Sequence, residues 1–154
     1  MADGNRILGA PVPAVVLGLA GAIPFVVGAL AMAFGSNSVE LTAYFYLMSY
    51  ASLILAFLGA VHWGLALAAD RVGWGWYGVS VAPALLGWVA YGLIDPVHRV
   101  ALLALAYVGV FLVDVQAVRA GLAPAWYPRL RKPLTVIVVL ALGIVGFVAG
   151  GAAQ

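Results

Sequence analysis

Long runs of apolar residues, separated by short polar breaks, make up almost the whole chain. A helix needs roughly 20 apolar residues to cross the hydrocarbon core of a bilayer, which is about 30 Å thick. Five runs are long enough, and apolar positions continue around each of them rather than along one stripe, as is typical of helices in lipid. The pattern predicts an all-α, single-domain membrane protein (1–154), a compact bundle of five transmembrane helices at about 12–34, 40–69, 74–93, 96–118 and 132–150.

The breaks between the runs contain residues that start or end helices. "GSNS" at 35–38 is a cluster of turn-forming residues. "DRVG" at 70–73 places two charges beside a glycine. "DP" at 95–96 offers an aspartate N-cap followed by proline at the first helical position, which is a strong signal for a helix start. These breaks predict four turns or loops that separate the helices, the fourth being the stretch 120–132.

The fifth run differs from the others in its flanks and its polarity. It follows "AGLAPAWYPRLRK" at 120–132, the one long connection in the chain. We expect the helix to begin at residue 132, after this connection. Because the run has little polarity after Thr135, we also expect it to lie at the edge of the bundle.

Composition supports lipid as the solvent of this chain. Of 154 residues, 66% are hydrophobic and 8% are charged, whereas soluble domains carry about 25% charged residues. The chain has no cysteine, which excludes disulfides and thiol catalysis. Its net charge of +2 is too small for a nucleic-acid-binding surface, so nucleic acid is not an expected partner.

Basic residues predict the orientation, because short cytoplasmic loops carry an excess of Lys and Arg. One side of the predicted bundle holds six of them, whereas the other side holds only Arg99. We therefore expect a multi-pass protein of the bacterial inner membrane with its N-terminus in the cytoplasm. Three of the six form a basic patch at the inner surface, suited to anionic lipid headgroups or an acidic partner. The six are Arg6, Arg71, Arg119 and the patch residues Arg129, Arg131 and Lys132.

The second run predicts a helix with protein on both of its faces. One face carries a ladder of small residues at a spacing of four, which lets a neighbouring helix approach closely. His62 lies roughly opposite this ladder, and an imidazole is unfavourable against lipid tails. We therefore expect the second helix to be central, with Trp63 filling the groove beside the ladder. The ladder is Ser52, Ala56, Ala60, Gly64 and Ala68.

A polar intramembrane site is predicted around His62. Counting a rise of about 1.5 Å per residue places His62, Ser80 and Asp114 in the inner half of the bilayer. Tyr107 shares a helix face with Asp114, and we expect His62 to be buried and hydrogen-bonded, with Ser80 or Asp114 as its partner. The site would fix the register of the helices, pass a proton or solute, or bind a quinone or lipid. A hydrolytic triad is disfavoured, because "GVSVAP" at 78–83 provides neither a strained nucleophile turn nor an oxyanion hole.

Haem and metal are not expected. A haem held by two histidines needs both ligands at a similar depth, but His62 lies in the inner half and His98 begins the fourth helix at the outer surface. Two histidines without cysteine also make a poor zinc site. We read Asp95, His98 and Arg99 as a solvated helix cap. No cofactor is predicted, although a quinone or a lipid is left open.

Four stretches together resemble a known family of multi-pass membrane proteins. They are "GAIPFVVGA" (21–29), "LGAVHWGLAL" (58–67), "SVAPALLGWVAY" (80–91) and "YPRLRKPLT" (127–135). The family is domain of unknown function 3429, and the histidine–tryptophan block is the most specific part of the resemblance. The family occurs in proteobacteria, and its animal relatives include transmembrane protein 69, thought to be mitochondrial. The resemblance implies a membrane location and supplies no mechanism.

From these observations we expect a non-enzymatic accessory or assembly protein of an energy-transducing membrane. Its expected partners are membrane lipids and a larger membrane complex. The alternative is a small transporter or proton pathway, or a quinone- or lipid-binding protein that uses the site around His62. A pathway would need a wet cavity that connects His62 and Asp114 to one surface. The chain shows no internal repeat of the kind that many transporters use.

Overall fold

The computed structural model describes residues 6–7, 9–69 and 73–151. Residues 70–72, which include Arg71 and most of the expected break at 70–73, lie outside this description. A short antiparallel hairpin of β1 (Arg6–Ile7) and β2 (Ala10–Pro11) precedes five helices. This architecture agrees with the expected all-α membrane protein. The helices are α1 (Val12–Phe34), α2 (Asn37–Ala68), α3 (Trp74–Gly92), α4 (Pro96–Arg119) and α5 (Tyr127–Gly151).

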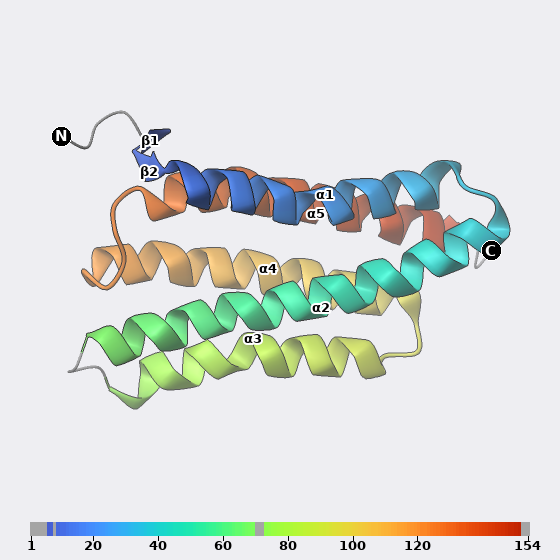
Figure 1. The fold of residues 1–154 in the computed structure, drawn as a ribbon. Coiled ribbons are helices and arrows are strands. Elements are labelled where there is room, and N and C mark those ends of the chain that lie inside the picture. The colour runs from blue at the N-terminus through green and yellow to red at the C-terminus, as the bar shows by residue number, and fades with distance from the viewer. Residues whose placement is uncertain (1–5, 8, 70–72, 152–154) are drawn as a thin grey trace.

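The five helices run side by side as one bundle, in which α1 begins and α5 ends at opposite ends (Figure 1). The second helix, α2, packs against α1, α3 and α4, and α4 packs against α2, α3 and α5. The central position expected for α2 is therefore shared with α4. The expectation that α5 lies at the edge is wrong: α5 packs against both α1 and α4, and its Leu142 and Val145 are fully buried.

Two helices begin earlier than expected. Helix α2 starts at Asn37 rather than at residue 40, with Ser36 at the N-cap position. Helix α5 starts at Tyr127 rather than at residue 132. Pro128 does not prevent this, because the first N–H groups of a helix have no partner within the helix and a proline there loses nothing. The earlier start matters for the site, since it places Arg131 inside the helix.

The end of α4 is set by a glycine in the left-handed region. Gly121 has φ = 75°, which glycine adopts without strain. Its N–H donates to the Val118 carbonyl oxygen at 3.0 Å, and the Leu122 N–H donates to the Ala117 carbonyl oxygen at 2.8 Å. These two bonds form a Schellman motif, which satisfies the last carbonyl groups and turns the chain out of the helix. The connection to α5 starts there.

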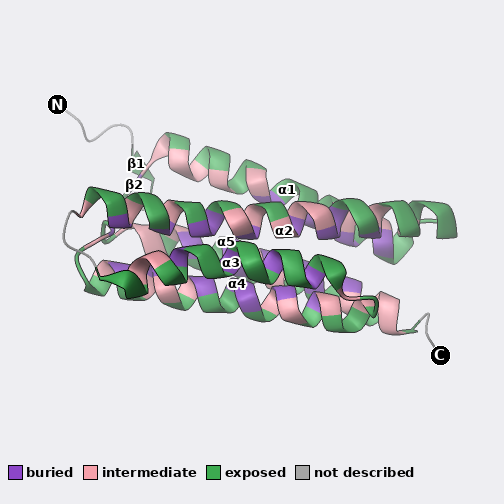
Figure 2. Ribbon diagram, turned by 90° about the horizontal axis from the view of Figure 1, so that it is seen from below, coloured by how far each residue is buried: buried purple, intermediate pink, exposed green. Residues whose placement is uncertain are grey.

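Buried positions face the neighbouring helices and exposed positions face outward (Figure 2). The outward side is covered with large apolar side chains, a surface that water does not favour and lipid does. Among the described residues, four helices are long and apolar enough to cross a membrane: α1, α2, α4 and α5. The 19-residue α3 is not one of these four. Outward apolar side chains include Leu17, Phe57, Leu105, Leu140 and Phe147.

The contact between α2 and α3 uses only part of the expected small-residue ladder. Ser52 donates a hydrogen bond to the Gly87 carbonyl oxygen at 3.2 Å. In contrast, Ala60, Gly64 and Ala68 are exposed, and nothing lies within 4 Å of where a Gly64 side chain would begin. The closest approach is instead at Gly59, which the ladder did not include.

Candidate functional site

The buried polar centre of the bundle is a cluster of three side chains, His62, Asp114 and Arg131, which we call the charge cluster. Asp114 is completely buried. Its Oδ2 accepts a hydrogen bond from Arg131 Nε at 2.8 Å, and its Oδ1 lies 3.1 Å from His62 Nε2. His62 is 3% exposed and Arg131 is 8% exposed. The cluster therefore joins α2, α4 and α5 through one carboxylate.

The sequence places Asp114 and Arg131 at the same depth. Asp114 belongs to the inward face of α4, where buried residues recur every three or four positions. It lies five residues before the end of α4, and Arg131 lies four residues after the start of α5. With a rise of about 1.5 Å per residue, both side chains are about 6–8 Å inside this end of the bundle. The turn at Gly121 thus reverses the chain so that Arg131 of α5 lies at the same depth as Asp114 of α4.

The hydrogen bond of the His62 ring shows which of its two nitrogens carries a proton. Nδ1 lies 2.9 Å from the Leu58 carbonyl oxygen, and because a carbonyl only accepts, Nδ1 carries a proton. Nε2 lies close to Asp114 Oδ1, but the two atoms are not aligned for a hydrogen bond. The contact is therefore one of proximity and charge rather than a directed bond.

The charged groups of the charge cluster can be buried only because they are paired. Removing an ion from water costs several kcal/mol even in a relaxed protein, so a buried ion needs a partner and hydrogen bonds. Asp114 has a cation on one oxygen and a basic ring near the other. In a membrane, such a group is a candidate for function because its burial is costly.

Of the predicted site residues, His62 and Asp114 come together, and Ser80 does not join them. The expectation that His62 is buried between helices is confirmed, and Asp114 lies beside it, but the hydrogen bond of its ring goes to the Leu58 carbonyl oxygen of its own helix. Ser80 is also buried, but its hydroxyl donates to the Tyr77 carbonyl oxygen of its own helix at 2.6 Å. A short hydroxyl side chain is readily satisfied in this way by the preceding turn.

Tyr107 and Trp63 lie near the charge cluster, and each forms a contact between helices. Tyr107 is 1% exposed, and its hydroxyl donates to the Ala51 carbonyl oxygen at 2.7 Å, which links α4 to α2. Trp63 is 43% exposed and its ring meets Tyr77 edge-on, with centroids 5.0 Å apart. The expectation that Trp63 fills the groove between helices is therefore wrong: it covers the outer edge of the α2–α3 contact.

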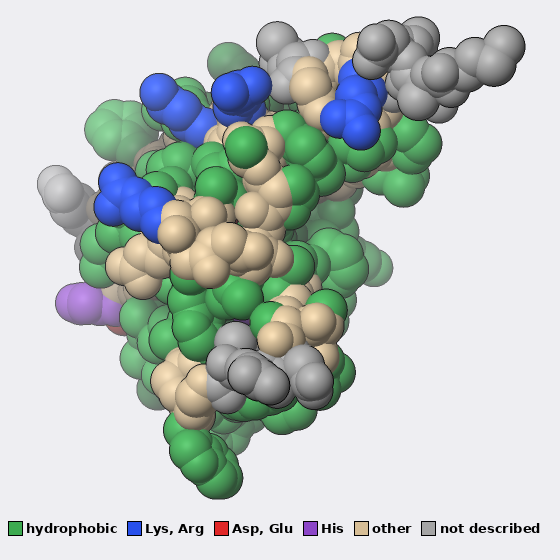
Figure 3. Space-filling model, turned by 90° about the vertical axis from the view of Figure 1, so that its left-hand side faces the viewer, with side chains coloured by type: hydrophobic (Ala, Val, Ile, Leu, Met, Phe, Trp, Pro, Cys, Tyr) green, Lys and Arg blue, Asp and Glu red, His purple; other side chains and the backbone are tan. Residues whose placement is uncertain are grey.

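Only two of the three residues of the expected basic patch lie at the surface. Arg129 and Lys132 are exposed, whereas Arg131 points into the bundle and binds Asp114. The expectation for Arg131 was therefore wrong, because the helix starts before it rather than after it. A signal existed: Arg131, Leu134 and Val138 follow the spacing of one buried helix face. The exposed basic side chains gather at this end of the bundle (Figure 3).

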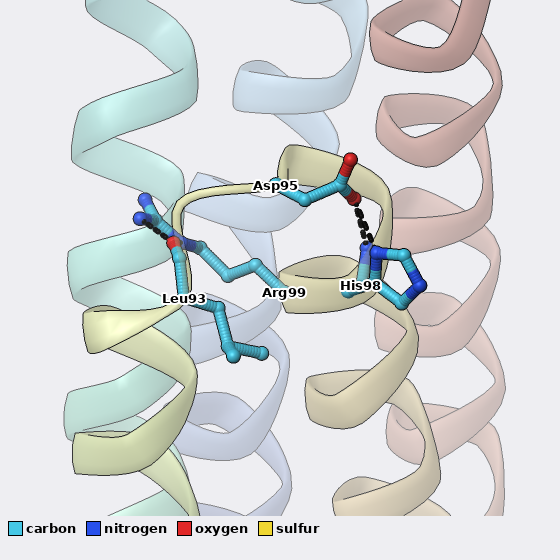
Figure 4. Close-up of polar contacts among 4 residues, drawn as sticks. All are labelled: Leu93, Asp95, His98 and Arg99. Carbon is cyan, nitrogen blue, oxygen red and sulfur yellow. Dashed lines mark hydrogen bonds and ion pairs between the residues drawn. The ribbon is translucent and has the colours of Figure 1, made fainter.

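The opposite end of α4 is capped by Asp95 and His98 as expected, but Arg99 does not take part in the cap. Asp95 Oδ1 accepts hydrogen bonds from the His98 backbone N–H at 2.8 Å and from its ring Nδ1 at 2.7 Å (Figure 4). The backbone bond, followed by the bond from the ring, lowers the pKa of Asp95 below its ordinary value. Arg99 turns away from this cap and donates to the Leu93 carbonyl oxygen, with its guanidinium 5.6 Å from the centre of the Tyr44 ring.

The charge cluster supplies two metal-ligand side chains, His62 and Asp114. Within the described part of the chain, no third His, Cys, Asp or Glu side chain joins them in a group that could hold a metal ion. His98 lies at the other end of α4, about 24 Å from the level of Asp114 at 1.5 Å per residue. The cluster is thus a buried ion pair with a histidine beside its carboxylate.

Comparison with known proteins agrees with this structure. The family model described as "Protein of unknown function (DUF3429)" matches residues 10–147. The chain is 36% identical to transmembrane protein 69 of Xenopus tropicalis over 137 residues, which cover 86% of this chain and 53% of that protein. It is 27% identical to transmembrane protein 69 of Mus musculus over 138 residues, 88% of this chain and 56% of that protein.

The chain thus spans about half the length of the curated relatives that it matches. No solved structure matches it significantly. The helices that can cross a membrane and the two relatives support a multi-pass membrane protein. The family match covers most of the chain, including every residue of the charge cluster, and so this protein belongs to the DUF3429 family, whose function is unknown.

Proposed function

We propose that this chain is a five-span inner-membrane protein with its N-terminus in the cytoplasm, and that it acts as a non-enzymatic accessory or assembly protein of an energy-transducing membrane. The single observation that carries the proposal is the charge cluster of His62, Asp114 and Arg131. Its carboxylate pairs with Arg131, lies against His62 and so ties three helices together, as a packing element does. The resemblance to a family with a mitochondrial branch supports the energy-transducing membrane.

Chain connectivity supports a fifth span. Helix α2 ends at the end of the bundle where α3 begins, and α4 begins at the opposite end (Figure 1). If α2 and α4 cross the membrane, the chain between them has to return across it. The 19 residues of α3 reach about 28 Å, close to the thickness of the hydrocarbon core.

The exposed charges support the orientation. Arg6, Arg119, Arg129 and Lys132 are exposed, and the helix bounds place them at the end of the bundle where α1 begins. Figure 3 shows Lys and Arg side chains gathered at that end. The other end carries Arg99 together with the acidic residues Glu40 and Asp95. Although Arg131 is removed from the exposed set, the excess of basic residues still favours a cytoplasmic N-terminus.

The alternative, a transporter or proton pathway, has less support. A relay across the membrane needs ionisable groups in both halves of the bundle. Among the described residues, the buried polar and charged side chains are His62, Ser80, Asp114, Arg131 and Thr135. All five lie toward the cytoplasmic end of the proposed topology, and the large side chains that surround them toward the other end are apolar or aromatic.

Crosslinking in native membranes tests the accessory role. A photoreactive amino acid is placed at exposed positions on different faces, at Trp88 of α3 (75% exposed) and at Phe147 of α5 (85% exposed). An accessory protein is expected to capture a defined set of membrane subunits from one face and to co-purify with them in mild detergent. Capture of lipid or of the chain itself from both faces would contradict the proposal.

A further inference from the structure

A pocket lies at the end of the bundle where α2 and α4 begin, away from the charge cluster. Its volume is about 500 Å³, within the range of about 300–1,000 Å³ that is usual for ligand sites in proteins. Its walls come from α1, α2, α4, α5 and the loop between α3 and α4, and most of them are apolar. Two side chains of opposite charge also line it, Arg99 of α4 and Glu40 of α2. The pocket therefore offers both signs of charge in an apolar setting.

The guanidinium of Arg99 is held in one position. Its Nε and Nη2 both donate to the Leu93 carbonyl oxygen in the loop between α3 and α4 (Figure 4). Its central carbon lies 5.6 Å from the centre of the Tyr44 ring and 5.8 Å from the centre of the Tyr91 ring, distances at which a cation and an aromatic ring attract each other. Because a carbonyl group and two rings already orient it, Arg99 is prepared to bind an anion.

One edge of this guanidinium remains available. Leu93 occupies the edge formed by Nε and Nη2, so that Nη1 has no hydrogen-bond partner among the described residues. Arg99 is half-buried, and Nη1 is not sealed inside the protein, in contrast to the Tyr44 hydroxyl. No carboxylate of the described chain forms an ion pair with Arg99. The free edge, Nη1 with the second N–H of Nη2, can bind two oxygens of one phosphate side by side.

Glu40 supplies the opposite charge, closer to the end of the bundle. It is half-buried, and its carboxylate forms no ion pair within the described chain and is not sealed from the surface. Glu40 precedes Tyr44 by four residues, so the two share a face of α2, and Glu40 lies about 6 Å nearer to the start of the helix. Since the guanidinium of Arg99 lies at the Tyr44 ring, the cation is the deeper of the two charges.

This order of charges matches the head of one class of phospholipid. In phosphatidylethanolamine the phosphate is next to the glycerol and the acyl chains, and a short arm carries a primary ammonium outward. A primary ammonium donates N–H groups, which a carboxylate accepts, whereas a choline head has no N–H to donate. A purely anionic head would place a like charge beside Glu40, which disfavours binding.

The apolar walls provide a place for the acyl chains. Leu41 and Phe45 of α2 line the pocket and are 60% and 52% exposed. Because α2 and α4 are long and apolar enough to cross a membrane, a pocket at their ends lies near the lipid headgroups. A phospholipid can therefore place its head between Arg99 and Glu40 while its acyl chains follow the side of the bundle.

We propose that this pocket binds the head of a phospholipid that carries a phosphate and a primary ammonium, with the phosphate on Arg99 and the ammonium on Glu40. In the proposed topology the lipid belongs to the outer leaflet. The inference needs only that α2 and α4 cross the membrane, and it stands independently of the accessory role. A chain that binds this lipid and captures no partner would support the site and contradict that role. A chain that captures partners and shows no headgroup preference would do the reverse.

Native mass spectrometry of the purified full chain in mild detergent tests the site, with dioleoyl lipids as the probes. We expect one phosphatidylethanolamine per chain to bind saturably, and about tenfold more tightly than phosphatidylglycerol. Arg99→Gln should weaken the binding of phosphatidylethanolamine about tenfold, because it removes the cation from the phosphate. Arg119→Gln is the matched control, since it removes the same charge from an exposed position at the other end of α4.

A second variant changes the preference between headgroups. Glu40→Gln keeps the size of the side chain but removes its charge, so phosphatidylethanolamine should bind about tenfold more weakly and phosphatidylglycerol should not, which abolishes the preference. Asp95→Asn is the matched control at the same end of the bundle and should keep the preference, because Asp95 bonds to His98 and does not line the pocket.

Three results would count against the site or its ligand. Equal binding of the two lipids to the parent chain would overturn the proposed headgroup. Unchanged affinity in Arg99→Gln together with an unchanged preference in Glu40→Gln would overturn the site. Glycerophosphoethanolamine, the same head without acyl chains, should fail to displace the bound lipid. Its displacement of the lipid at an equal concentration would show that the pocket takes a soluble zwitterion instead.

Discussion

Gly59 of α2 lies directly against the backbone of Ser80 of α3, so that a side chain at Gly59 would overlap the Ser80 carbonyl oxygen. Close backbone approach at a small residue is how helices pack in a membrane, where no hydrophobic effect drives them together. The contact is next to the charge cluster in sequence, because His62 follows Gly59 by three residues on α2. It holds α2 against α3 at the same depth at which His62 of α2 meets Asp114 of α4.

Gly59→Ala is expected to destabilise the bundle by about 1–3 kcal/mol, because one methyl group has to displace a backbone carbonyl of α3. Gly64→Ala is the matched control on the same helix. Nothing lies within 4 Å of its new methyl group, so the change should be neutral or slightly stabilising. The free energy of unfolding in a detergent titration measures both, and equal values for the two variants would contradict the close contact.

The cap at Asp95 predicts a pH dependence. The His98 backbone N–H and then the His98 ring lower the pKa of Asp95 below its ordinary value of 3.8. Because the folded-state pKa is the lower one, the stabilisation is complete above the ordinary value and is lost as the pH falls through the folded-state value. Asp95→Asn keeps a good N-cap residue but removes the titration.

Thermal unfolding of the parent and of Asp95→Asn between about pH 2 and pH 6 measures this effect. The parent should lose more stability than the variant as the solution is acidified below about pH 4. Parallel curves would show that the carboxylate contributes nothing through the cap.

Single cysteines test the topology, since the chain has none of its own. Ile94 is 95% exposed in the loop between α3 and α4, and Ala125 is exposed in the loop between α4 and α5. A membrane-impermeant maleimide should label Ile94→Cys in intact cells and Ala125→Cys only after permeabilisation. Labelling of Ala125→Cys in intact cells would reverse the orientation. Labelling of Ile94→Cys and Ala125→Cys from the same side would show that α4 does not cross the membrane.

Much of the helical architecture could be predicted, because lipid leaves few alternatives. A run of about 20 apolar residues has to satisfy its backbone within a helix, and such runs are visible in the sequence. The approach of His62 to Asp114 could also be predicted, since both are ionisable groups that avoid lipid and lie at a similar depth by simple counting.

Arg131 was missed for a physical reason. A basic residue beside a membrane helix has a ready explanation in the positive-inside tendency, and the whole stretch 120–132 was interpreted as a connection that precedes the helix. In the structure, Pro133 lies inside α5, and the ion pair with Asp114 together with the buried Leu134 and Thr135 accompanies the earlier start. Tertiary contacts such as these decide helix ends, and local sequence does not contain them. The small hairpin of Arg6–Ile7 and Ala10–Pro11 was missed because two-residue strands give no periodic signal.

His62→Leu is expected to lower the free energy of unfolding by about 1–2 kcal/mol, because the variant loses the contact with Asp114 and the bond to the Leu58 carbonyl oxygen. The fold should persist, since Arg131 still pairs with Asp114. Ser80→Ala serves as the comparison and should be close to neutral, as the Ser80 hydroxyl bonds only within its own helix. A leucine variant as stable as the parent would show that His62 does not hold the helices in register.

A double-mutant cycle on Asp114 and Arg131 measures most directly whether their ion pair holds the bundle together. Asp114→Asn and Arg131→Met each leave the other partner buried without its counter-charge, and each should cost about 3–5 kcal/mol of unfolding free energy. The double variant leaves no unpaired charge between these two positions. Its loss should therefore be smaller than the sum of the two single losses by at least about 1 kcal/mol. Strictly additive losses, or single variants as stable as the parent, would contradict the claim that the buried Asp114 carboxylate binds α4 to α5 through Arg131.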